Sequence, residues 1–425
     1  MRLFRRPIGA AVAGIGVAIG LASLAGFALL ALIGRLLTPA DFGLFVSFWG
    51  VLFGIGGSLS TIEQESARRT ATEDGERGPS PTAVTAAAAG LAALAASITL
   101  LPPVAARLYG EDGGWLGLVV VLSAVGFAIQ FTVRGVLIGS NSVRGYAGIV
   151  IAEAVARLVL LLVVVVAFGA SVTTAAIAVA AGSFVWLIWS RRARAALPLS
   201  ELKPRDAWPA TQRAGSLMIA AALTASVITG YPTMVAALTD QAPGAAGGAV
   251  FAALTVSRVP LLLVSPIQAM AVPAVIRLRS VAPQGRWSPL RKLLVAGPLA
   301  FACLGVLGGA AGWHVGPQIV QLVYGPAYEV PPAAVAMLVA SAFMLAWVLL
   351  TSAALVAFAA YRQMIVMWLA AAGATAVWLA LSPLDVVDST AIGAMIGPLA
   401  AMAWGIPVLW RLTSPSLAAR SAASQ

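Results

Sequence analysis

Twelve apolar runs, each long enough to cross a lipid bilayer, constrain this chain more than any other feature of its sequence. The hydrocarbon core of a bilayer is about 30 Å thick, and a helix of about 20 apolar residues spans it. Only 10% of the residues are charged and 60% are hydrophobic, so the chain has too few polar residues to cover a water-facing surface. The runs cover residues 8–34, 42–61, 83–106, 115–139, 146–168, 171–190, 214–238, 247–276, 293–312, 333–360, 364–382 and 389–410. We therefore expect an all-α polytopic membrane protein with twelve transmembrane helices.

The turn that joins the first two runs has the pattern of a helix start. Thr38 is suited to cap the second helix, Pro39 suits its first turn, and Asp41 favours the positive end of the helix dipole. The first run, 8–34, is longer than the roughly 7–15 apolar residues of a signal peptide. The sequence therefore predicts that the chain begins with a tight hairpin of two membrane helices.

Lysine and arginine are distributed unevenly between the connections of the twelve runs. If the N-terminus lies in the cytoplasm, nearly all of them fall in cytoplasmic segments, and the outer connections hold only Arg35 and Arg107. An excess of basic residues in cytoplasmic loops is the usual orientation signal of membrane proteins. We expect a protein of the cytoplasmic membrane with both termini in the cytoplasm. This bias, with anionic lipid headgroups, explains the net charge of +11. We therefore expect membrane lipids as partners and no nucleic acid.

The longest cytoplasmic connection, 191–213, divides the twelve runs into two sets of six. It is polar and contains Pro198, Pro204 and Pro209. We interpret residues 1–190 and 214–425 as two six-helix lobes with a cytoplasmic linker between them. An even number of spans in each lobe makes the lobes parallel repeats, related by an axis along the membrane normal.

Three stretches resemble those of a known transporter family. "RLLTPADFGLF" (35–45) resembles the first outer turn of polysaccharide flippases in the multidrug/oligosaccharidyl-lipid/polysaccharide exporter superfamily. "LTVSRVPLLLVSPIQAMAVPAVIRL" (254–278) is similar to their eighth span, and "VYGPAYEVPPAAVAML" (323–338) to the turn before their tenth. The resemblance implies two lobes around a central cavity, and alternating access that carries a polyprenyl-pyrophosphate-linked oligosaccharide outward.

Four ionisable side chains lie inside the predicted spans, where charge is costly and is usually functional. Glu153 and Arg157 are four residues apart and share one helix face. Arg134 lies near the inner end of its span, one turn from Gln130. Arg258 lies at mid-membrane depth, with no charged residue three or four positions away. We predict that these five residues line the substrate cavity.

Each of these candidates has a structural alternative. Glu153 and Arg157 could form a self-satisfied pair that only fixes helices together, and Arg134 could extend its charge to the cytoplasmic headgroups. Pro232, Pro260 and Pro266 interrupt two spans and are candidate hinges. Ordinary proline kinks are the alternative for these three positions.

The charge of the predicted cavity suits an anionic cargo. Three arginines against one glutamate make it cationic, and the planar guanidinium donors of arginine match the oxygens of a pyrophosphate. An exporter of drugs or metabolites with the same fold is the first alternative, although a cation-coupled drug exporter is expected to carry further membrane-embedded Asp or Glu. A non-transporting membrane scaffold for cell-envelope synthesis is the second.

Catalytic chemistry finds little support in the sequence. His314 and Cys303 are the only residues of their types, and no P-loop lysine motif is present. We therefore expect a transporter that is not an enzyme and has no cofactor or metal site. Its expected partners are the lipid-linked glycan and the enzymes of polysaccharide assembly.

Overall fold

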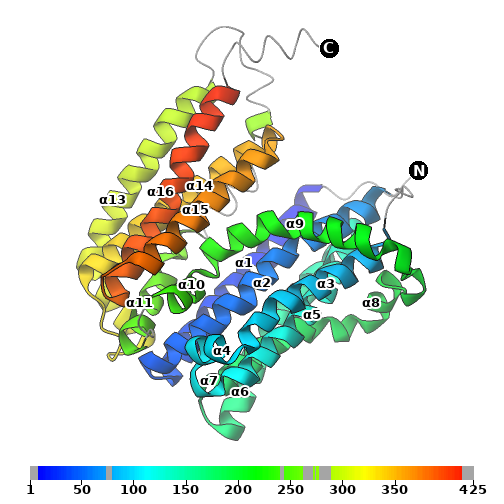
Figure 1. The fold of residues 1–425 in the computed structure, drawn as a ribbon, viewed down its shortest axis with the longest axis horizontal. Helices are drawn as coiled ribbons and strands as arrows, with labels where there is room; N and C mark the ends of the chain where they lie inside the picture. Colours follow the sequence, from blue (N-terminus) through cyan, green and yellow to red (C-terminus); the bar gives the residue numbers. More distant parts are fainter. Residues whose placement is uncertain are drawn as a thin grey trace. The chain divides into compact units, whose positions relative to one another are not determined.

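A computed structural model describes residues 8–72, 79–239, 244–261, 271–272, 274–276 and 289–413 of the chain. All regular elements in these segments are helices (Figure 1). By the packing of its helices the chain divides into two compact units, Met1–Ala237 and Leu238–Gln425. This division describes which helices pack together and does not test the transmembrane topology. The lobes expected at 1–190 and 214–425 therefore stay a prediction.

In the first unit, the long helix α2 is central. It packs along α5 and α9, while α3 lies against α5 and α9, and α1 and α7 lie against α6. The unit holds α1 (Ile8–Leu36), α2 (Pro39–Thr72), α3 (Pro81–Ser97), α4 (Pro102–Tyr109), α5 (Gly113–Gly139), α6 (Val143–Phe168), α7 (Val172–Ala181), α8 (Ser190–Ala196), α9 (Ala207–Ile228) and α10 (Tyr231–Leu238), the last ending at its border.

In the second unit, α14 is central. It packs on α13 and α16, α16 also packs on α15, and α11 lies against α14. The elements are α11 (Gly244–Ser257), α13 (Pro289–Tyr324), α14 (Pro332–Ala357), α15 (Tyr361–Leu381) and α16 (Val386–Leu412).

The expected multi-pass membrane fold is confirmed. Among the described residues, 11 helices are long and apolar enough to cross a bilayer, and the number rises to 12 if the bent pair α9–α10 is one span. Many large apolar side chains on these helices are exposed, as lipid-facing side chains would be. The cytoplasmic location of the termini stays a prediction.

The predicted tight turn between the first two helices is confirmed, while α1 packs mainly on α6. The Asp41 amide donates to Thr38 Oγ1 at 3.2 Å, and the Thr38 hydroxyl donates to Asp41 Oδ2 at 2.8 Å. Because α2 begins at Pro39, these bonds occupy groups that the first turn of a helix leaves without intrahelical partners. The sequence pattern therefore identified a structural turn.

The broken span forms where Pro232 follows Gly230. Helices α9 and α10 meet at an angle of 75°, and the amides of Thr229 and Gly230 both donate to Ala225 O at 2.8 Å. Proline at the start of α10 has no amide to continue the ladder of α9, which accounts for the break. Pro260 follows a turn at Arg258, and Pro266 lies outside the described residues. The hinge role of all three prolines stays a prediction.

Candidate functional site: a buried ionic network in the first unit

Three helices of the first unit bring six polar side chains together. One comes from α2, two from α5 and three from α6, and each side chain is largely or wholly buried. Four of them were predicted from the sequence and two were not. The predicted residues are Gln130, Arg134, Glu153 and Arg157, and the added ones are Glu63 and Tyr146.

Arg134 is the centre of this network. Its Nε lies 2.9 Å from Glu63 Oε2, its Nη1 lies 3.6 Å from Glu153 Oε2, and its Nη2 donates to Tyr146 Oη at 3.0 Å. The Tyr146 hydroxyl in turn donates to Glu63 Oε1 at 3.0 Å. Arg134 therefore bridges two carboxylates inside the helix bundle instead of extending toward the headgroups.

Arg157 fixes the other end of the network. Its Nη2 pairs with Glu153 Oε1, its Nε donates to Val179 O at 3.2 Å, and its guanidinium lies 4.9 Å from the centre of the Phe53 ring. The side chain lies directly over Gly182, where an added Cβ would collide with the guanidinium. Glycine at this position therefore makes room for Arg157.

Gln130 supports the same carboxylate from a fully buried position. Its Nε2 donates to Glu153 Oε2 at 2.8 Å. Its Oε1 has no hydrogen-bond partner among the described residues. A buried amide with an unused acceptor is unusual, and the Gln130 carbonyl oxygen can accept a hydrogen bond from one more donor.

The network is electrically balanced, which corrects one expectation. Three arginines against one glutamate were expected, whereas two carboxylates face two guanidiniums here. Glu63 was missed because the second apolar run ends at residue 61, while α2 continues to Thr72. Arg258 lies in the second unit, directly after α11, where it is partly buried and has an interaction partner.

Two glycines of α5 allow α2 to approach closely enough to place Glu63. A Cβ on Gly135 would collide with Glu63 O and lie 2.7 Å from Ser66 Cβ. A Cβ on Gly139 would lie 2.5 Å from Ala67 O. Small residues four apart are a common way for membrane helices to pack closely. The sequence "GVLIG" (135–139) carries this signal.

A second ionic cluster ties α2 to α9 beyond the network. Glu65, which is buried, accepts from Arg69 Nε at 2.8 Å, from Arg213 Nη2 at 3.0 Å and from Arg68 Nε at 3.0 Å. Arg69 also donates to Pro79 O at 2.7 Å. Three guanidiniums around one carboxylate give this cluster an excess of positive charge, and Arg68 and Arg213 are partly exposed.

Removing the tyrosine hydroxyl tests the network without removing a charge. Tyr146→Phe is expected to lower the free energy of unfolding by about 1–3 kcal/mol, because the hydroxyl bonds both Glu63 and Arg134 and a hydrogen bond to a charged group contributes about that much. Thermal unfolding in detergent would measure the change. Tyr361→Phe, at an exposed position, is the control, and equal stability of the two variants would contradict the role of the hydroxyl.

The sequence is similar to two mycobacterial proteins over almost its whole length. No protein-family model matches it. It is 30% identical over 412 residues to the uncharacterized protein Rv1510 of Mycobacterium tuberculosis, an alignment that covers 94% of this chain and 91% of the relative. It is also 30% identical over 399 residues to the uncharacterized protein Rv3630 of the same species, with 91% and 89% covered. The chain belongs to the family of these mycobacterial proteins.

The fold of this family member is shared with solved transporters. An inward-facing multidrug resistance MATE family transporter of the MOP superfamily matches with a TM-score of 0.65 at 16% identity, covering 95% of this chain and all of the other. The outward-facing conformation of such a transporter matches with a TM-score of 0.54 at 15% identity, covering 97% of each chain. At this identity the likeness shows the fold alone.

Proposed function

We propose that this protein is a membrane transporter that works by alternating access and moves a polyprenyl-pyrophosphate-linked oligosaccharide from the inner to the outer leaflet. One observation carries the transport part of the proposal, namely the match of nearly the whole chain to transporters solved in inward-facing and outward-facing conformations. A fold alone does not fix a function. The buried ionic network adds a site-level reason, because ionisable groups inside a membrane bundle are costly and usually line a transport pathway.

The proposed cargo rests on the sequence motifs and on the distribution of arginine. The network of α2, α5 and α6 is balanced, so an anionic cargo needs positive charge from elsewhere. The Glu65 cluster of the first unit supplies it, with three guanidiniums around one carboxylate. Guanidinium groups bind pyrophosphate oxygens through pairs of parallel hydrogen bonds.

Export of small amphipathic drugs or metabolites is the second candidate. Two observations favour it, since the matched structures include multidrug resistance transporters and the network holds a second buried carboxylate, Glu63. One transporter with this fold, from Pyrococcus furiosus, is described as having a binding pocket of reversed polarity that suggests a different function. Pocket charge therefore discriminates between the two candidates better than the fold does.

Purified protein in proteoliposomes tests the proposal directly. A fluorescent polyprenyl-pyrophosphate disaccharide is placed in both leaflets, and dithionite bleaches the outer one. We expect vesicles with protein to lose more glycolipid fluorescence than empty vesicles. The inner-leaflet fraction of a fluorescent phosphatidylcholine should stay protected in vesicles with and without protein. Movement of ethidium without movement of the glycolipid would favour the drug candidate. Movement of neither substrate by folded protein would favour the scaffold for envelope-synthesis enzymes.

Arg258→Ala is the variant that addresses the second unit. We expect it to insert normally and to move the glycolipid at least about tenfold more slowly, because a charged hydrogen bond contributes about 1.5–3 kcal/mol. Arg205→Ala is the matched control, since the Arg205 side chain is 78% exposed and its Nε lies 3.9 Å from Asp206 Oδ1. Equal transport by the two variants would remove Arg258 from the cargo site.

A further inference from the structure

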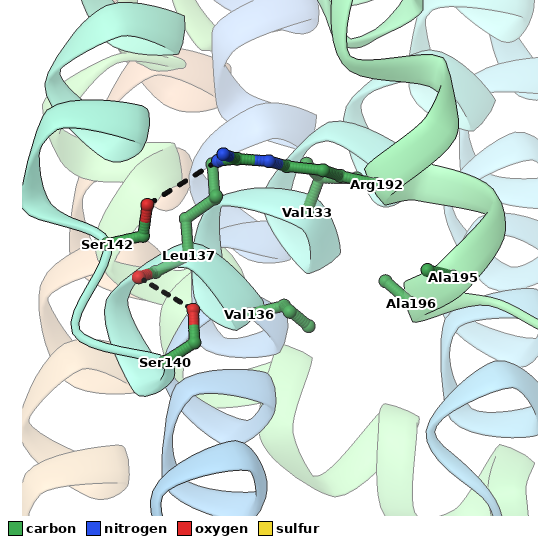
Figure 2. A pocket seen from close by; sticks show the side chains of 8 residues that line it. All are labelled: Val133, Val136, Leu137, Ser140, Ser142, Arg192, Ala195 and Ala196. Atoms are coloured by element: carbon green, nitrogen blue, oxygen red, sulfur yellow. Dashed lines mark hydrogen bonds between the residues drawn. The ribbon is translucent and has the colours of Figure 1, made fainter.

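A pocket of about 340 Å³ lies between the C-terminal end of α5 and α8, and none of its lining residues belongs to the ionic network (Figure 2). Its wall is mostly apolar, and two of its residues, Val133 and Leu137, belong to a buried hydrophobic cluster that also contains Tyr146. The lining residues are Val133, Val136, Leu137, Ser140, Ser142, Arg192, Ala195 and Ala196.

The polar groups of this pocket lie along one edge. Arg192 extends from α8 toward the α5–α6 turn, where its Nη1 donates to Ser142 Oγ at 3.4 Å (Figure 2). The Ser142 side chain makes no capping bond to α6, although Ser142 precedes that helix. The Ser140 hydroxyl donates to Leu137 O at 3.3 Å. The long Arg192–Ser142 hydrogen bond is weak, so an anion could replace Ser142 as the partner of the guanidinium at little cost in free energy.

The surroundings of the pocket are strongly basic. Arg144, Arg191 and Arg194 come from the same two segments as its lining and are exposed. Neither 131–152 nor 182–200 contains an aspartate or glutamate. Glu153 and Glu201 follow directly after these segments, and Glu153 is paired with Arg134 and Arg157, so the arginines around the pocket outnumber the carboxylates. This is the composition of basic pockets that bind lipid headgroups at the cytoplasmic side of membrane helices.

The neighbouring surface has the character of a membrane interface. Trp186 and Trp189 pack against the hydrophobic cluster that contributes Val133 and Leu137 to the pocket, and between them Leu187 and Ile188 are 55% and 72% exposed. Tryptophan concentrates where membrane helices meet the headgroups. The positive-inside orientation predicted from the sequence places this end of α5 and α8 at the cytoplasmic leaflet.

We infer that this pocket binds an anionic glycerophospholipid of the cytoplasmic leaflet. Arg192 and Ser142 hold the phosphate oxygens, and the apolar wall takes the first methylenes of an acyl chain. A volume of about 340 Å³ suits a headgroup with its glycerol and not a complete lipid, so the acyl chains remain in the bilayer. The bound lipid would link the α5–α6 turn to α8. This inference does not depend on the transported cargo, and failure of the transport assay would leave it standing.

Native mass spectrometry of the detergent-purified chain tests the inference with phosphatidylglycerol and phosphatidylcholine of equal acyl composition. We expect wild-type protein to retain phosphatidylglycerol preferentially. Arg192→Ala should weaken that binding about tenfold, as loss of a charge-assisted contact predicts. Ala196→Trp, which fills the apolar part of the pocket, should weaken it as well. Arg205→Ala removes an equal charge from an exposed position and should leave binding unchanged.

Three results would overturn the inference. The first is equal retention of the two phospholipids, which would show an apolar cavity without a phosphate site. The second is equal phosphatidylglycerol binding by Arg192→Ala and Arg205→Ala. The third is displacement of phosphatidylglycerol by an equimolar polyprenyl phosphate, which would make the pocket a cargo site. Because Arg192 is exposed, we expect Arg192→Ala to fold normally. Thermal unfolding of each variant in detergent distinguishes a loss of binding from a loss of fold.

Discussion

Arg134→Met is expected to lower the free energy of unfolding by about 3–5 kcal/mol, the usual loss when one partner of a buried ion pair is removed. The guanidinium contacts Glu63, Glu153 and Tyr146, and it lies 5.0 Å from the centre of the Phe131 ring. Without it, Glu63 keeps only the Tyr146 hydroxyl among the contacts of the network, and Glu153 keeps Arg157 and Gln130, so the network holds one more carboxylate than guanidinium. Methionine keeps much of the side-chain volume, so the loss reports charge and hydrogen bonding more than packing.

A compensating double variant separates stability from function. Glu63→Gln with Arg134→Met removes one charge of each sign and leaves the balanced Glu153–Arg157 pair. Replacing both partners of a buried pair is often close to neutral for stability. We therefore expect the double variant to recover most of the loss measured for Arg134→Met. Thermal unfolding in detergent and the glycolipid assay are measured on the same preparations.

Transport by the double variant decides the role of the network. If the proposal is right, the protein is folded and transport remains strongly reduced, because the ionisable groups act in the transport cycle. Normal transport by a stable double variant would show that the network only fixes helices together. The same design, with Glu153→Gln and Arg157→Met, decides between the two interpretations of that pair. Arg205→Ala is the control for a general loss of positive charge.

The sequence predicted the spans and the first turn because both depend on local physics. Bilayer thickness sets the length of an apolar run, and the Thr38–Asp41 cap uses only residues within one turn. Three network residues, Arg134, Glu153 and Arg157, were also predictable, since an ionisable group in an apolar run is conspicuous. Glu63 was not predictable by that rule, because α2 extends beyond its apolar run and carries the carboxylate into the bundle.

The partners of the site residues depend on helix pairing, which one sequence does not reveal. Nothing near Arg134 in the sequence indicates that α2 supplies its carboxylate or that Tyr146, twelve residues away, supplies a hydroxyl. The stretch 171–190 likewise reads as one uniform span, whereas the structure has α7, a 3-10 segment at Gly182–Trp189, and then α8. The 3-10 segment begins where Gly182 accommodates Arg157. Glycines four residues apart were the available sign of close packing on α5, at Gly135 and Gly139 against α2 and at Gly113 and Gly117 against the segment before α5.

Gly135→Val is expected to destabilise the protein by at least about 3 kcal/mol, toward the upper end of the cost of overpacking a core. A Cβ at this position meets the backbone of α2, at Glu63 O and within 3.1 Å of Ala67 N, so no side-chain rotation relieves the collision. Separation of α2 from α5 would also draw Glu63 away from Arg134, and transport should fall with stability.

Gly90→Val in α3 is the matched control for this prediction. It is the same substitution in a helix, at a position where an added Cβ meets no atom within 4 Å. Replacing an unpacked helical glycine should be neutral or stabilising, since glycine is a poor helix former. The two variants are therefore expected to move the melting temperature in detergent in different directions, or at least by very different amounts. Equal melting temperatures would mean that α2 and α5 can separate freely. The position of Glu63 would then not depend on the glycine contact, and the network would lose its structural support on α2.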